Sequence, residues 1–99
     1  AVSGSGPAYF FYVIEAIVAA GVGEGLDADV ARRLAVQTCI GAMELLDGTG
    51  EDPAVLRAKV TSPGGTTQAA IESMEASGVR EALIAAVRRA SGRSRELGQ

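Results

Sequence analysis

Residues 60–67 read Val-Thr-Ser-Pro-Gly-Gly-Thr-Thr and lead into Gln-Ala-Ala-Ile, a pattern typical of a loop that runs into a helix. Thr61 or Ser62 can act as the N-cap, and Pro63 suits the first helical position, where an N–H would have no partner. Two glycines in a first helical turn cost about 1 kcal/mol each relative to alanine. Close approach of the backbone to a carboxylate or phosphate would justify them, because helix N-termini offer free N–H groups. A tight turn or a close helix crossing would explain the same glycines.

The composition predicts one small domain that shares its core with a partner. The chain has 99 residues, of which 47% are hydrophobic, yet it contains only two Phe, two Tyr and no Trp. Small aliphatic side chains suit close contact between helices, and so many of them indicate that a partner covers part of the surface. The net charge of −3 gives no reason to expect nucleic-acid or membrane-surface binding. The longest apolar runs include charges or glycines, so we expect no membrane span.

The chain contains no histidine, which excludes Ser–His–Asp and Cys–His catalysis and histidine-ligated metals. No metal site is expected. Cys39, the one cysteine, lies in an apolar run and is interpreted as an inert core residue of a cytoplasmic protein. Because the chain begins at Ala1 within a Ser/Gly loop, we expect it to be a piece of a longer protein.

The rest of the sequence predicts an all-α fold of about five helices and no sheet, since no stretch alternates with period two. The first helix, at about 7–20, is apolar nearly all round and is expected to be buried, mostly against a second subunit. Asp27 should cap a second helix to about residue 46, and Asp52 a short third helix at 53–59. The fourth should run from the 60–67 stretch to residue 76, where Gly78 follows, and the fifth starts near residue 79. Arginines crowd its C-terminal half, a pattern more typical of a solvated face than of a phosphate site.

Two segments together resemble one enzyme family. Residues 3–9, Ser-Gly-Ser-Gly-Pro-Ala-Tyr, are similar to the opening of the C-terminal domain of pyrroline-5-carboxylate reductases, and residues 60–67 resemble that family's signature loop. The acidic loop before Pro53 and the closing Ser94-Arg95-Glu96-Leu97 also fit. The resemblance covers essentially all of residues 1–99, which it implies form a single helical dimerisation and substrate-binding domain.

The resemblance also implies a fold, an activity and an assembly. The fold is an interlaced dimeric helical bundle like the C-terminal domain of 6-phosphogluconate dehydrogenase. The parent enzyme reduces 1-pyrroline-5-carboxylate to L-proline with NADPH or NADH, the last step of proline biosynthesis. An N-terminal Rossmann domain, absent from this chain, holds the dinucleotide, so no tightly bound cofactor is expected here. The domain forms a homodimer, and in some members a decamer built as a pentamer of dimers. We expect the 99-residue fragment to dimerise without reductase activity.

The same resemblance assigns roles to individual residues. Backbone N–H groups around Gly65, Thr66 and Thr67 would receive the substrate carboxylate, with Ser62 helping. The Thr67 hydroxyl would lie near the ring nitrogen as the catalytic group, although water could equally supply the proton. Thr66 would act chiefly through its backbone. Gly6 and Pro7 would lie close to the nicotinamide ring.

Two other interpretations remain open from the sequence. The fragment could be a purely structural dimerisation module in which the Gly-Gly turn only permits close packing. It could also belong to a related NAD(P)-dependent imine or keto-acid reductase, or to a competence-type paralogue that shares this domain.

Overall fold

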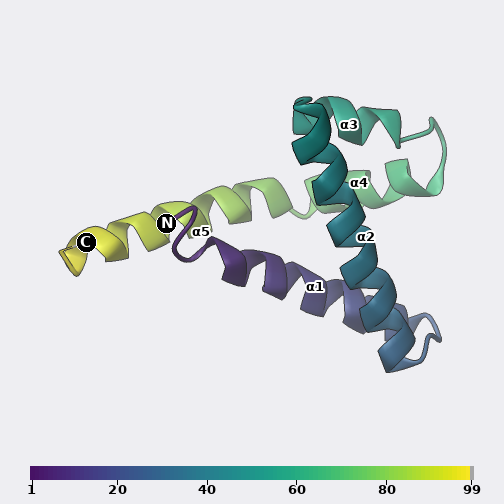
Figure 1. Cartoon of the computed structure of the whole chain (residues 1–99), viewed down its shortest axis with the longest axis horizontal. Helices are drawn as coiled ribbons and strands as arrows, with labels where there is room; N and C mark the ends of the chain where they lie inside the picture. The colour runs from purple at the N-terminus through teal and green to yellow at the C-terminus, as the bar shows by residue number, and fades with distance from the viewer. Residues whose placement is uncertain (99) are drawn as a thin grey trace. The chain divides into compact units, whose positions relative to one another are not determined.

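The computed structural model describes residues 1–98, and within that range it contains five α-helices and no strand (Figure 1). The helices are α1 (Gly6–Gly23), α2 (Ala28–Thr49), α3 (Pro53–Lys59), α4 (Thr66–Ala76) and α5 (Val79–Glu96). The prediction of an all-α fold is confirmed. Two compact units are present, one formed by Gly6–Glu51 and the other by Ala1–Ser5 with Asp52–Gln99. The assignment of 1–99 to a single domain stays a prediction, and its last residue, Gln99, lies outside the described residues.

The unit Gly6–Glu51 consists of α1 and α2, which pack against each other through small residues. A Cβ added at Gly21 of α1 would come within 3.1 Å of the Ala31 Cβ of α2. Helix α1 continues through this glycine to Gly23, beyond the predicted end at residue 20. The missing side chain at Gly21 lets the two helices approach closely.

Both ends of α2 follow from local chemistry. Asp27 is the N-cap, as predicted, and its carboxylate accepts the N–H of Asp29. The helix ends at Thr49, three residues beyond the predicted residue 46, and Gly50 terminates it with φ +66°. The Gly50 N–H donates to the Leu46 carbonyl at 3.2 Å, a left-handed cap that glycine adopts without steric penalty.

The second unit contains α3, α4 and α5. Helix α3 has the predicted bounds, and the Asp52 side chain accepts the Ala54 N–H at 2.9 Å. Helix α4 ends at Ala76, and Gly78 follows with φ +74°, as the sequence predicts for a glycine after a helix. The same glycine directly precedes α5, so a two-residue link joins the two helices.

Very little of the apolar surface is covered by this chain alone. Ala31 and Ala35 are the hydrophobic residues that are buried among residues 1–98. The sequence predicts a buried α1, but Phe11 and Tyr12 are 68% and 73% exposed, because the chain contains too little protein to surround the helix. Exposure of large apolar side chains on this scale marks a surface for contact with another protein or with a membrane.

Helix α1 also bears on the expected absence of a membrane span. Among the described residues it is the one helix long and apolar enough, by length and composition, to cross a membrane. The core helix of a soluble protein also passes this test. The test therefore does not show whether a bilayer or a partner subunit covers α1. The expectation of no membrane span therefore stays a prediction.

Candidate functional site

The loop between α3 and α4 holds the predicted site residues, but α4 begins later than the sequence indicates. Its N-cap is Gly65 and its first residue is Thr66. The prediction of Thr61 or Ser62 as N-cap, with Pro63 in the first turn, is wrong. Both glycines precede the helical residues, so the penalty for glycine inside a helix does not apply to them.

The two glycines instead shape the turn that leads into α4. Gly64 has φ +73°, in the left-handed region where a side chain is strained. The Gly65 N–H donates to the Ser62 carbonyl at 3.0 Å, and a Cβ at Gly65 would lie 3.2 Å from that oxygen. A larger residue at either position would disturb the turn.

This turn leaves a defined set of amides open at the start of α4. The Gly65 N–H is engaged with Ser62, and the Gly64 N–H donates to Oε1 of Gln68. No acceptor within residues 1–98 takes the N–H groups of Thr66, Thr67 or Gln68, and the helix has no side-chain cap. Three adjacent N–H groups at the positive end of a helix dipole can bind a carboxylate.

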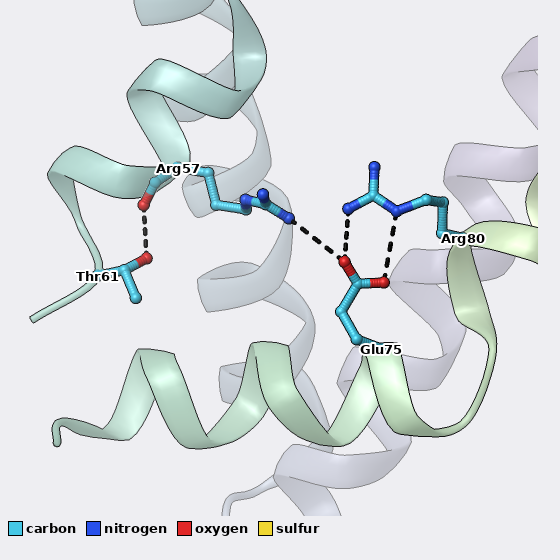
Figure 2. A network of polar contacts seen from close by, with 4 residues as sticks. All are labelled: Arg57, Thr61, Glu75 and Arg80. Carbon is cyan, nitrogen blue, oxygen red and sulfur yellow. Dashed lines mark hydrogen bonds and ion pairs between the residues drawn. The ribbon is translucent and has the colours of Figure 1, made fainter. Parts of the chain in front are cut away.

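The N-terminal side of the loop is tied to α3. The Thr61 hydroxyl donates to the Arg57 carbonyl at 2.5 Å, and the Thr61 N–H donates to the Ala58 carbonyl at 3.1 Å. Figure 2 shows the Arg57 guanidinium extending from α3 toward Glu75 of α4, with 4.0 Å between Nη1 and Oε1. Arg57 therefore connects the start of the loop to the helix that follows it.

Glu75 also accepts from Arg80 of α5 (Figure 2). The Arg80 Nη2 lies 2.5 Å from Oε1, and Nε lies 3.4 Å from Oε2, a two-point contact between guanidinium and carboxylate. The hydrogen bond from Arg80, supported by the charges of Arg80 and Arg57, lowers the pKa of Glu75 below the ordinary value of 4.5. One carboxylate thus joins α3, α4 and α5.

This cluster predicts an acid-sensitive contribution to stability. Because the pKa of Glu75 is lower in the folded than in the unfolded chain, the contribution is full above pH 4.5 and is lost as the pH falls through the folded-state value. We expect Glu75→Gln to lower the unfolding midpoint at pH 7, and the difference from the unsubstituted protein to shrink between about pH 5 and pH 3. The effect should be small, since all three side chains are partly exposed.

Thermal unfolding followed by circular dichroism across this pH range checks the prediction. Glu72→Gln is the matched control, because it removes the same charge from the same helix outside this cluster. A Glu75→Gln deficit that persists unchanged below pH 3 would show that packing, and not the charge, is responsible.

The structure does not place all predicted site residues in one unit. Ser62, Gly65, Thr66 and Thr67 lie together in the α3–α4 loop and the first turn of α4. Gly6 and Pro7 begin α1, in the other unit. Gly6 is buried, although a Cβ built there would meet nothing within 4 Å.

A hollow of about 480 Å³ lies elsewhere, between the N-terminal loop and α5, and Ser5, Arg93 and Leu97 are among its lining residues. It contains none of the predicted carboxylate-binding residues. In the C-terminal half of α5, Arg89 and Arg93 pair with Glu96 of the same helix. Such pairing agrees with a solvated basic face.

The comparisons with known proteins identify the family. The model of the family "Pyrroline-5-carboxylate reductase dimerisation" matches residues 1–97. The chain belongs to this family. Pyrroline-5-carboxylate reductase from Synechocystis is 52% identical over 98 residues, which cover 99% of this chain and 37% of the relative. The chain thus spans about a third of that relative's length.

Solved structures of pyrroline-5-carboxylate reductases share the fold. The Plasmodium falciparum enzyme with NADP bound matches with a TM-score of 0.94 and 32% identity, over 99% of this chain and 40% of that one. The Coxiella burnetii enzyme matches with a TM-score of 0.93 and 43% identity, over 97% and 36%. Membership in the pyrroline-5-carboxylate reductase dimerisation family supports homo-oligomerisation of this chain.

Sequence reasoning missed one residue of the loop. Gln68, half-buried in the first turn of α4, accepts from Gly64 and so belongs to the turn. The signal was present in the sequence, because Gln or Glu three residues after an N-cap commonly reaches back to the preceding backbone. The pattern was overlooked because the N-cap was predicted at Thr61 or Ser62 and not at Gly65.

Proposed function

We propose that this chain is the C-terminal domain of an enzyme that reduces 1-pyrroline-5-carboxylate to L-proline with NADPH or NADH, the last step of proline biosynthesis. The observation that carries the proposal is the family match along residues 1–97. The open amides at the start of α4 supply a group suited to a substrate with a carboxylate. A cytoplasmic location accords with such a role.

In this proposal the substrate carboxylate binds at the N-terminus of α4. The N–H groups of Thr66 and Thr67 donate to it, and the Ser62 hydroxyl adds a further donor from the loop. Gly65 contributes by shaping the turn, since its N–H donates to the Ser62 carbonyl and a Cβ there would lie 3.2 Å from that oxygen. The helix dipole favours the bound negative charge.

The reaction itself needs orientation more than a protein nucleophile. NAD(P)H supplies the hydride that the imine carbon receives. Within this chain, the carboxylate site holds the ring in one orientation, and we place the Thr67 hydroxyl beside the ring nitrogen. When the imine becomes an amine, the nitrogen gains a proton from Thr67 or from water. No hydrogen-bond partner within residues 1–98 occupies the Thr67 hydroxyl.

The cofactor would be held mainly outside this chain. Residues 1–98 contain no strand, and therefore no strand–turn–helix site for a dinucleotide pyrophosphate. We propose that a Rossmann domain in the rest of the protein holds it, with Gly6 and Pro7 against the nicotinamide. We further propose a homodimer through the helical domain, and a decamer as the assembly of the full-length enzyme.

The test compares the full-length protein with the isolated 99-residue chain. We expect the full-length protein to oxidise NADPH or NADH with 1-pyrroline-5-carboxylate, and the isolated chain to show no turnover, because the dinucleotide site is missing. Absorbance at 340 nm measures both. Turnover by the isolated chain near that of the full-length protein would contradict the proposed division of the site, and an inactive full-length protein would contradict the proposed function.

A further inference from the structure

The side chain of Gln68 makes a contact that the proposed mechanism does not use. Its Oε1 accepts the Gly64 N–H, across the turn that leads into α4. Because an N–H donor must face an oxygen, this contact fixes which end of the carboxamide points to the backbone. The residue is half-buried. It is the third residue of α4, whose N-cap is Gly65.

The Gly64 N–H is one of two amides of the turn that the protein satisfies internally. The other is the Gly65 N–H, which donates to the Ser62 carbonyl. With both engaged, the amides that remain open are those of Thr66, Thr67 and Gln68, all in the first turn of α4. The Gln68 contact thus engages an amide that shapes the loop. The amides of the first turn of α4 stay open to a ligand.

The contact also restrains Gly64, whose backbone is in the left-handed conformation. Gly64 has φ +73°, and nothing lies within 4 Å of the place where its Cβ would be, so packing does not restrain it. A glycine is free to leave this conformation, and a hydrogen bond to its N–H is the restraint that keeps it there. If Gly64 moved, Gly65 and the Ser62 carbonyl would move with it.

The chemical type of the side chain is informative as well. Glutamate at this position would accept the same hydrogen bond and would interact favourably with the helix dipole. It would also place a negative charge where the substrate carboxylate is proposed to bind. Glutamine supplies the acceptor without the charge.

We propose that Gln68 is a positioning residue of the carboxylate site: it holds Gly64 in its left-handed conformation and so keeps the amides of Thr66 and Thr67 in place for the substrate. This inference rests on the proposed function. Gln68 acts through the loop and takes no part in hydride or proton transfer. Its loss should therefore raise the KM for the imine and leave kcat nearly unchanged.

The experiment uses the full-length enzyme and three variants. Gln68→Leu removes the acceptor with little change in size, and we expect a rise of about tenfold in KM for 1-pyrroline-5-carboxylate, with kcat within about twofold. Gln68→Leu should also speed hydrogen exchange in residues 60–68. Gln68→Glu restores the acceptor and adds a charge, so exchange should return to the unsubstituted level while KM stays raised. Ser73→Glu adds the same charge later in α4 and should leave KM unchanged.

The outcomes separate this inference from the function on which it rests. Unchanged KM and unchanged exchange in Gln68→Leu, in an otherwise active enzyme, overturn the positioning role and leave the reductase assignment intact. A fall in kcat together with a lowered unfolding midpoint indicates a general structural role and also overturns it. An unsubstituted enzyme that shows no turnover overturns both.

Discussion

Thr67→Ala in the full-length enzyme is expected to lower kcat by about 100-fold while leaving the dimer intact. The proposed site places the Thr67 hydroxyl beside the ring nitrogen, so its removal affects the step in which the imine becomes an amine. The backbone N–H of residue 67 remains in the variant, and carboxylate binding should therefore persist. Steady-state kinetics with 1-pyrroline-5-carboxylate, together with sedimentation velocity, measure both effects.

The neighbouring threonine provides the matched control for this prediction. Thr66 is exposed at the first position of α4, and the site proposal uses only its backbone. Thr66→Ala should keep kcat within about threefold, and Thr67→Ser should restore most of the activity, because it restores the hydroxyl. If Thr67→Ala turned over as fast as the unsubstituted enzyme, the loop would be a packing turn and the purely structural interpretation would hold.

Phe11→Glu is expected to dissociate the homodimer. The Phe11 side chain is 68% exposed in the isolated chain, on a helix that is apolar nearly all round. Burial of an aromatic side chain at an interface often contributes more than 2 kcal/mol, and a buried unpaired carboxylate adds a further penalty. A rise of at least 100-fold in the dimer dissociation constant follows, since about 2.7 kcal/mol corresponds to that factor.

Sedimentation at micromolar concentration checks this result. The unsubstituted chain should sediment with twice its mass of 10.0 kDa, and the variant as a monomer with partial loss of helicity. Gln37→Glu is the control, because it adds the same charge on a polar stretch of α2 near Arg33. A 10.0 kDa monomer for the unsubstituted chain would contradict dimerisation through this domain.

The exposed apolar surface of this chain shows how much composition alone can predict. The abundance of small apolar residues predicts a shared core, and the structure agrees in that Ala31 and Ala35 are the buried hydrophobic residues among 1–98. Which side chains of α1 stay uncovered depends on its packing against α2. That packing follows from the close approach at Gly21, which periodicity does not reveal.

For the candidate site, the sequence located the loop but not the helix boundary. Local preferences allow a helix to start at Pro63, and the motif itself contains residues that could cap it there. The structure starts α4 at Thr66, because Gly64 takes a left-handed conformation and Gly65 becomes the N-cap. The identity of the open amides follows from this shift, and so does the contact between Gly64 and Gln68.

The sequence by itself determined the all-α class, the caps at Asp27 and Asp52, and the resemblance to the reductase family, because each depends on residues close together in the chain. Tertiary structure alone decided that Arg57 of α3, Glu75 of α4 and Arg80 of α5 meet. This cluster depends on where three helices lie relative to one another, which the order of residues within a short window does not specify.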